Sequence, residues 1–467
     1  MHNLKKFFLF YYTLKDVGWI RIFKRILFLA RQSIESKLFK FIIFFYCSEK
    51  FDWNFNLLIN IKKMEIREKN VIDNKIDLNF LNQENKLTIP LIWEYKTKSR
   101  LWNFNLHYFD WGMELLEKNY LNNSRIFFSN IEFLMDSWIE HHLKNYTDGW
   151  NSYTLSIRIR NWIWFFRTCP YLVSKKRLHA LWIQLIWLND HKEDYLGGNH
   201  YLENLMTLVF AALQYKNQKA DQIYLKSLAK LKEILLEQIL SDGGHEERSA
   251  SYHIALLKRL IETALMIETA RNIRPIWLID NISKMIIWTK KIRLNQDKYP
   301  RFNDCFFSKE IDIKQVIEFG ESYLNRINLI SNRKSFSSIL LQEIYPDVSA
   351  SNNKINQLIE IDSKKIIDLP STGWTILRPG NDWEIVFKSG LSCPAYLPAH
   401  AHSDTLTFDI FKNGIPIIAE TGTSIYQDSF IRKYERSGQA HNIMLLSIDN
   451  HNLIEPLEVW DSFRAAR

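Results

Sequence analysis

The chain changes its hydrophobic period once, and this change constrains the fold more than any other feature of the sequence. Between residues 101 and 341, apolar residues recur at intervals of three and four, in segments separated by short polar or glycine-containing breaks. This spacing is typical of successive amphipathic helices. We therefore predict helical hairpins that stack as a bundle, solenoid or toroid. The predicted helices span residues 129–143, 154–166, 176–187, 201–214, 220–240, 251–271 and 276–291.

The period changes after residue 344. Residues 373–377 and 383–388 alternate apolar and polar side chains around the turn Pro379-Gly380-Asn381-Asp382, and residues 457–463 are again strand-like. Alternation between turn signals predicts antiparallel strands. The predicted organisation is an N-terminal helical segment (1–90), a helical domain (91–345), a linker (346–370) and a β domain (371–467) that could be incomplete.

The first fifty residues are rich in aromatic and basic side chains. No small-residue cleavage site follows the basic start, so we do not expect a secretory signal, which leaves cytoplasm and periplasm open. The apolar stretch at residues 41–47 is much shorter than the ~20 residues that span a bilayer. We expect amphipathic helices that pack on the body of the protein or lie on a surface, and no membrane span.

Charge and cysteine usage limit the partners. A net charge of +9 is compatible with nucleic acid, a membrane surface or an acidic polysaccharide. The chain lacks a long basic block and any zinc-finger, RNP-like or Walker pattern, so nucleic acid is not expected. Its four cysteines are scattered without C-x-x-C pairing, which predicts neither a disulfide framework nor a thiolate metal site.

Two histidines one residue apart, His400 and His402, precede a predicted hairpin of residues 405–411 and 415–419. Such a hairpin would bring Glu420 near His402, and His441 would approach from a neighbouring strand. Two imidazoles and a carboxylate suit Zn²⁺ with a fourth position open. If both histidines lie on one strand, they point to the same side, so His402 could bind metal while His400 faces a substrate. The alternative is a set of ordinary hydrogen-bonded histidines.

Two loops of the helical region are dense in polar groups. The first, GGNHYLEN at 197–204, places His200 and Glu203 on one face of a first helical turn, where backbone N–H groups can meet an anion. The second, SDGGHEERSASYH at 241–253, places Tyr252 near the start of the next helix. Helix capping alone explains the glycines, and a functional cleft between the loops is the other interpretation. Trp150 and Asn151 suit either sugar binding or a well-bonded core.

Together these stretches resemble the heparinase II/III family of polysaccharide lyases. The likeness starts near residue 95 and leaves residues 1–90 uncovered. The resemblance implies an incomplete α/α toroid followed by an antiparallel β-sandwich. The matching segments are FNLHYFD (104–110), NSYTLSIRIRNW (151–162), GNHYLEN (198–204), DGGHEERSASYH (242–253), AHAHSDTLTFDIFKNGIPIIAETGT (399–423) and SGQAHN (437–442).

Enzymes of this family cleave uronic-acid polysaccharides by β-elimination, and relatives with this short architecture belong to bacterial surface-polysaccharide gene sets. By resemblance, Asn199 and His200 neutralise the uronate carboxylate, Tyr252 moves a proton and His400 reaches in from the β domain. The same resemblance places Glu203 in the cleft and implies a zinc ion on His402, Glu420 and His441. Glu420 stands where the family usually has aspartate.

The chemistry explains these residue types. Removal of the C5 proton puts charge beside the carboxylate, so hydrogen-bond donors there stabilise an enolate-like intermediate. Arg248 and Arg436 could add positive charge or stabilise loops. A positive cleft is expected to lower the pKa of Tyr252 from ~10. Tyr252 would then act as base and acid in turn, or as the acid with His400 as the base.

Two other functions remain open from the sequence. A glycoside hydrolase on the same scaffold needs two facing carboxyl groups, and the polar loops supply Glu203, Asp242, Glu246 and Glu247. A non-catalytic glycan-binding or surface-polysaccharide assembly protein would keep the cleft without turnover. The predicted partner is an anionic polysaccharide.

Overall fold

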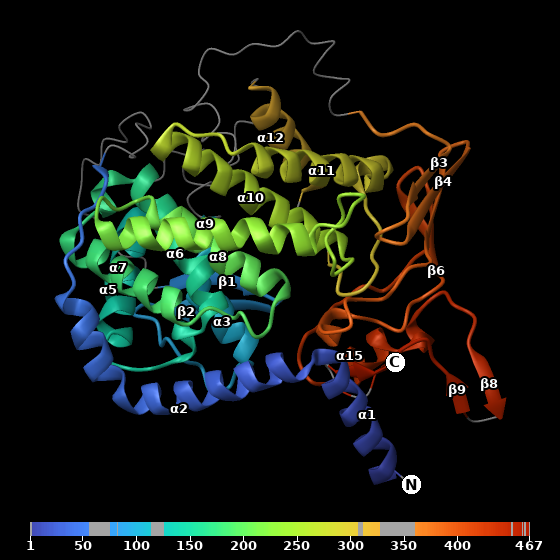
Figure 1. Ribbon diagram of the computed structural model, residues 1–467, viewed down its shortest axis with the longest axis horizontal. Helices are drawn as coiled ribbons and strands as arrows, with labels where there is room; N and C mark the ends of the chain where they lie inside the picture. The colour runs from blue at the N-terminus through green and yellow to red at the C-terminus, as the bar shows by residue number, and fades with distance from the viewer. Residues whose placement is uncertain are drawn as a thin grey trace.

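The computed structural model (Figure 1) describes residues 2–55, 75–81, 83–113, 126–306, 312–326, 360–449, 452–459, 461 and 464–466. Residues 346–359 of the predicted linker and residues 462–463 of the last predicted strand lie outside these ranges. A helical region comes first and a strand-rich region follows. Within the described residues, no helix has the length and apolar character needed to cross a membrane.

Helical hairpins in two layers build the first region. Helices α6 (Ser152–Thr168), α8 (Gly198–Ala212) and α10 (Ala250–Arg271) contact one another in that order. Every residue of α6 except Tyr153 is buried, which requires neighbours on every side of the helix. Each of the three pairs along the chain with a second-layer helix: α7 (Lys175–Asp190), α9 (Gln218–Gln238) and α11 (Ile276–Ile292). This arrangement is the predicted incomplete α/α toroid.

Further helices complete the helical region. The predicted helices are confirmed to within a few residues at each end. In the part of this region that the structure describes, the remaining α-helices are α3 (Arg100–Tyr108), α5 (Ile126–His142) and α12 (Ile313–Asn325).

The N-terminal segment forms α1 (His2–Val17) and α2 (Trp19–Ser48), as expected, with a bend at Gly18, whose φ is 83°. Helix α2 packs on α7 through the buried Phe39. The structure also contains a hairpin of β1 (Lys75–Phe80) and β2 (Gln83–Thr88), where we predicted only helix. Alternate residues of β1 are buried, so this short segment has the period of a strand.

The strand-rich region contains one antiparallel five-stranded sheet in the order β3-β4-β5-β6-β7. The predicted hairpins are confirmed: β4 pairs with β5 around Asn381 and Asp382, and β6 pairs with β7 around Asn413-Gly414. All four turn residues have positive φ, which suits Asn, Asp and Gly. The strands are β3 (Ile366–Leu369), β4 (Trp374–Gly380), β5 (Trp383–Lys388), β6 (Thr407–Lys412) and β7 (Ile415–Ile418).

Smaller elements follow the sheet: helix α15 (Phe430–Arg436) and two short strand pairs. Among the described residues there is no second large sheet. The five-stranded sheet contacts the toroid through Trp374, whose ring lies 5.3 Å from that of Trp288 on α11. The two regions therefore share a core. The strand pairs are β8 (Leu446–Asp449) with β9 (Asn452–Ile454), and β10 (Glu458–Val459) with β11 (Ala465–Ala466).

Candidate active site

Tyr252 and His400 meet where the toroid faces the strand-rich region. The Tyr252 hydroxyl lies 2.8 Å from the hydroxyl of Tyr426 and 3.5 Å from Nδ1 of His400. His400 ends a short 3₁₀ turn (Pro398–His400), so our prediction that His400 and His402 share a strand is wrong. The buried Arg436 donates to the carbonyls of Pro398 and Ala401 and fixes this turn instead.

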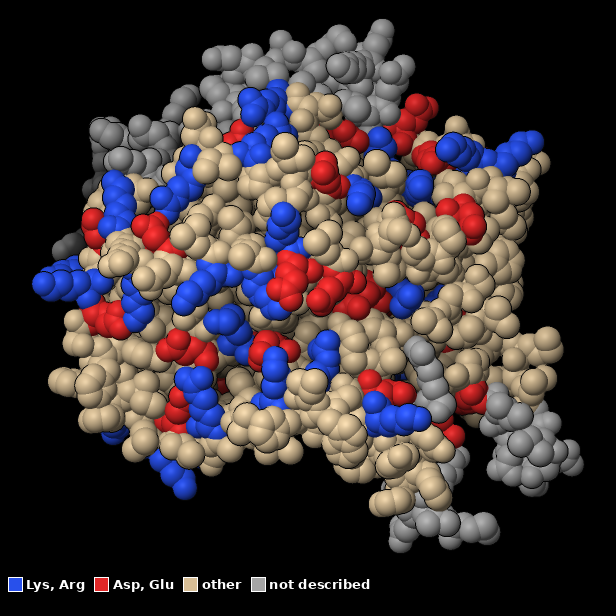
Figure 2. Space-filling model, viewed as in Figure 1, with Lys and Arg blue, Asp and Glu red and all other residues tan. Residues whose placement is uncertain are grey.

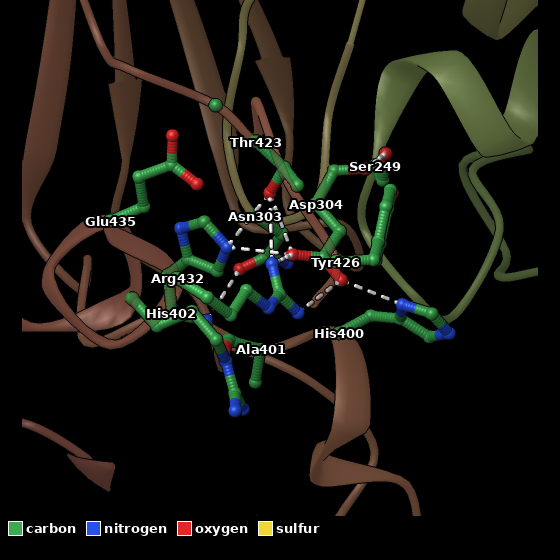
Figure 3. A network of polar contacts seen from close by, with 12 residues as sticks. Ser249, Asn303, Asp304, His400, Ala401, His402, Thr423, Tyr426, Arg432 and Glu435 are labelled. Carbon is green, nitrogen blue, oxygen red and sulfur yellow. Dashed lines mark hydrogen bonds and ion pairs between the residues drawn. The ribbon is translucent and has the colours of Figure 1, made fainter. Parts of the chain in front are cut away.

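The carboxylate of Asp304 is the centre of the site (Figure 3). It lies in the segment between α11 and α12 and is fully buried. Nδ1 of His400 donates to one oxygen and Nε2 of His402 to the other, each over 2.8 Å. The two terminal nitrogens of Arg432, Nη1 and Nη2, also donate to this carboxylate, and the Thr423 hydroxyl donates over 2.8 Å. One toroid residue thus orients four side chains of the strand-rich region.

These contacts fix the protonation of the site. Burial raises the pKa of Asp304, but Arg432 and the hydrogen bonds from the two histidines outweigh it and hold the pKa well below its usual range. An ionised Asp304 accepts the Nδ1 proton of His400, so the tautomer of this ring that can act as a base has its lone pair on Nε2. Figure 3 shows this second nitrogen pointing away from Asp304.

The pKa of Tyr252 differs from our expectation. Burial, followed by the neighbouring Tyr426 and Asp304, raises the pKa of Tyr252 well above its ordinary value. Arg432, which lies over the ring of Tyr426, is paired with Asp304 and does not offset this effect. The expected lowering by a positive cleft is therefore wrong for the protein without substrate, and the phenol is protonated at neutral pH.

The two polar loops of the toroid come together. The backbone N–H of Asn199 donates to Glu247 over 2.7 Å, which joins the first loop to the second. The ring of His200 stacks on Tyr153 with 4.3 Å between centroids, and its Nδ1 lies 3.4 Å from a carboxylate oxygen of Glu193. Burial lowers the pKa of His200, but the carboxylates, Glu193 first, outweigh burial and leave it raised. His200 is thus biased toward the cationic form.

Three predicted substrate-binding residues have structural roles. Trp150 is 1% exposed and donates its indole N–H to the His142 carbonyl, so it belongs to the aromatic core. Asn151 caps α6 by accepting from two backbone N–H groups. Glu203 is 2% exposed and pairs with Arg259 over 2.7 Å, which places its carboxylate behind the cleft. The aromatic and amide pattern failed here because it suits a core equally well.

The two arginines that we predicted in the site, Arg248 and Arg436, donate hydrogen bonds to backbone carbonyls of other segments. Arg248 donates to the carbonyls of Ser371 and Thr372, which join the second polar loop to the start of β4. Arg436 is fully buried, and three of its N–H groups donate to backbone carbonyls. Both therefore position catalytic loops, which is the alternative role we considered for them.

The predicted zinc ligands converge only in part. The rings of His402 and His441 lie 5.3 Å apart, and Nδ1 of His402 and Nε2 of His441 are buried without a hydrogen-bond partner. Glu420 instead accepts from Nδ1 of His441, the Thr407 hydroxyl and a backbone N–H. No group of three His, Cys, Asp or Glu side chains in the described residues has the arrangement of a metal site. The three-ligand set is thus not formed, but two orphaned nitrogens fit a metal.

Several residues of the site were missed by the sequence analysis. Asn303 joins the regions: its amide donates to the Glu247 and Ser392 carbonyls, and its oxygen accepts from Lys388 over 2.7 Å. Arg259 lies two helical turns after Tyr252 on α10, a spacing that could have revealed it. Asp304, Tyr426 and Arg432 had no recognisable local pattern.

Comparison with known families places this geometry in context. Residues 30–329 match the heparinase II/III N-terminus, and residues 362–467 match the heparinase II/III-like C-terminal region. The likeness begins at residue 30, so our expectation that it starts near residue 95 is wrong. The reason is that α2 packs on the toroid as part of the same domain. No curated protein matches the chain in sequence.

Solved structures agree in fold. A crystal structure of heparinase III is 17% identical, with a TM-score of 0.55 over 87% of this chain and 68% of its own. A heparan sulfate lyase HepC mutant from Pedobacter heparinus is 15% identical, with a TM-score of 0.53 over 91% and 68%. A further heparinase III gene product is 18% identical, with a TM-score of 0.48. The match covers 75% of this chain and 57% of that protein. From the two family matches, the chain belongs to the heparinase II/III family.

Proposed function

We propose that this protein is a polysaccharide lyase that cleaves a uronic-acid polymer by β-elimination. The observation that carries the proposal is the contact of Tyr252 with His400, where Asp304 orients the imidazole and leaves its Nε2 free. The protonated phenol of Tyr252 and, on the adjacent imidazole ring, the Nε2 atom that does not face Asp304 are the acid and the base that this reaction requires.

The proposed step assigns one role to each group. Nε2 of His400 removes the proton from C5 of the uronate, and the electron pair forms the double bond between C4 and C5. The bond from C4 to the glycosidic oxygen breaks, and Tyr252 gives its proton to that oxygen. The raised pKa of Tyr252 favours this assignment over one in which the phenolate is the initial base. Tyr426 holds the phenol in position through its hydroxyl.

The intermediate carries extra charge on the carboxylate. We assign Asn199 and His200 to this charge, because they lie at the N-terminus of α8 and the pKa of His200 is raised toward the cationic form. Glu193 and Tyr153 position the His200 ring.

A metal ion such as zinc would be held by His402 and His441, the two buried imidazoles with orphaned nitrogens. Burial lowers the pKa of His402 to about 4, so its lone pair is available at neutral pH. Glu420 would orient His441 through Nδ1, as carboxylates commonly do for metal-binding histidines. When bound, the ion would supply a structural link between two segments of the strand-rich region.

The direct test is incubation with a panel of uronic-acid polysaccharides, including heparan sulfate. Elimination leaves a conjugated double bond that absorbs in the near ultraviolet, and we expect such products from at least one polymer. New reducing ends without this absorbance would indicate a glycoside hydrolase. Binding without any cleavage across the panel would indicate a glycan-binding protein.

Replacing Asn199 or His200 by alanine is expected to lower kcat by about 10²-fold with a much smaller change in KM, because both groups act mainly on the charged intermediate. Steady-state kinetics on the best polymer measures both constants. Gln184→Ala, a buried amide that bonds Arg158 away from the cleft, is the control for loss of a polar side chain. A rise in KM at constant kcat would show that the two residues only bind substrate.

Protein purified without chelator is expected to contain roughly one equivalent of a transition metal, because two imidazole nitrogens directed at one site are good ligands for zinc. His402→Ala and His441→Ala should each lose the metal and lower the melting temperature, whereas Glu420→Gln should retain part of it. Elemental analysis and thermal melting with and without chelator give the result. A chelator-insensitive, metal-free wild-type protein would contradict this assignment.

A further inference from the structure

The outer face of α2 is apolar over its whole length. Eleven large apolar side chains of this helix are between 51% and 76% exposed. At about 100° per residue, most of them fall within an arc of about 120°. Six representatives recur at intervals of three, four, seven or eight residues: Trp19, Phe23, Ile26, Ile34, Phe41 and Phe45. Monomeric soluble proteins rarely expose a continuous apolar patch of this kind.

The opposite face of α2 holds the helix to the toroid. Phe39 and Ile43 are buried there, and Phe39 contacts the rings of Trp150 and Trp187. On the same side, Glu35 accepts from His191 over 2.5 Å. Helix α2 is therefore fixed in the orientation that points its apolar stripe outward. Figure 1 shows it along one edge of the toroid, with α1 projecting beyond the body of the protein.

Basic residues lie within the stripe and beside it. Residues 1–50 contain ten Lys and Arg and three Asp and Glu, so they carry +7 of the net charge of +9. At about 100° per residue, Lys37 lies within the stripe and Lys40 lies beyond one edge of it. Lys24 and Arg31 lie beyond the other edge, where they pair with Asp194 and Glu35. All four are exposed. A second copy docking through the same face would bring these cations together, which is unfavourable.

Helix α1 also exposes large apolar side chains. Phe7, Phe8, Phe10, Tyr11 and Tyr12 are all at least 45% exposed. Aromatic side chains at one end of an apolar stripe, with basic residues along it, suit the boundary between lipid headgroups and acyl chains.

We propose that α1 and the outer face of α2 bind the surface of an anionic lipid bilayer, with α2 lying in the plane of the interface. The apolar stripe supplies the burial, and the exposed Lys37 and Lys40 attract acidic headgroups. This surface is independent of the proposed lyase activity. It also lies next to the cleft: Arg21 of α2 stacks on Tyr396 at 3.7 Å, and both line a cavity of about 590 Å³ that reaches Gly197.

Vesicle co-sedimentation of the full chain tests the proposal. We expect binding to phosphatidylcholine vesicles that contain roughly one third phosphatidylglycerol, and binding about tenfold weaker to phosphatidylcholine alone or at high salt. Phe23→Asp/Phe41→Asp should lose at least about tenfold in binding. The matched control, Leu225→Asp/Ile276→Asp, adds the same charge at equally exposed apolar positions of α9 and α11 and should bind like wild type.

The outcomes are separable. Lys37→Glu/Lys40→Glu should weaken binding to the acidic vesicles. This variant keeps all apolar side chains, so it tests the contribution of charge separately from the Phe23→Asp/Phe41→Asp variant. Equal melting temperatures establish that the variants are folded. The proposal is overturned if wild type stays in the supernatant with acidic vesicles, or if the Phe23/Phe41 variant binds as wild type does. It is also overturned if sedimentation shows a dimer that this variant converts to a monomer.

Discussion

Tyr252→Phe is expected to reduce β-elimination by about 10³-fold while the protein remains folded, because only the acid is removed. The ring keeps its contacts with Phe306 and His400, which are made by carbon atoms. The loss should appear in kcat, and the variant should still bind polymer. Absorbance of the unsaturated product and a thermal melt measure activity and folding on the same preparation.

Two further tyrosines make this result interpretable. Tyr426→Phe leaves the acid in place but removes its 2.8 Å partner, so a smaller loss, about tenfold, is expected. Tyr215→Phe removes a buried hydroxyl that donates to the Leu178 carbonyl far from the site and should leave activity unchanged. Wild-type elimination by folded Tyr252→Phe would remove Tyr252 from the mechanism.

Asp304→Asn is expected to lower the free energy of unfolding by about 3–5 kcal/mol, because it leaves the buried Arg432 guanidinium without a counter-charge. It should also abolish activity in the molecules that remain folded, because an amide no longer fixes the His400 tautomer. Denaturant unfolding and product absorbance measure the two effects. Asp194→Asn, at an exposed pair with Lys24, is the matched control and should cost about 0–1 kcal/mol.

The same carboxylate predicts a dependence on pH. Its pKa is lowered in the folded protein, so its contribution to stability is complete above the unfolded value of ~3.9 and is lost as pH falls toward the folded value. Wild type should therefore lose stability on acidification through this range, and Asp304→Asn should lose less. A stability difference between the two that does not shrink at acid pH would contradict the assigned ion pair.

Periodicity and turn residues predicted most of the fold. Long helices such as α10 have a strong period of 3.6, and the β4–β5 and β6–β7 turns contain Asn, Asp or Gly at positions of positive φ. The β1–β2 hairpin was missed because six-residue strands carry little periodic signal. The 3₁₀ turn at His400 was missed because its geometry is imposed by Arg436, 36 residues later.

The sequence predicted only those residues of the candidate site that lie in a recognisable local motif. The loops that carry His200 and Tyr252 are polar and glycine-rich, and they do meet through Glu247. Asp304 and Arg432 contact each other across 128 residues of sequence, so no local signal connects them. Trp150 and Asn151 have the composition of a sugar site, but a core tryptophan and a helix cap need the same atoms.

The partnership of Asp304 and Arg432 has an evolutionary consequence. The two charges come from different regions of the chain, both are fully buried, and each neutralises the other. Substitution of either residue alone leaves an unpaired charge in the core. The pair can therefore be lost in evolution only if both positions change together. Among relatives, these two positions should therefore be inherited as a unit. The outer face of α2 requires only apolar and basic character, and there the individual residues are free to drift.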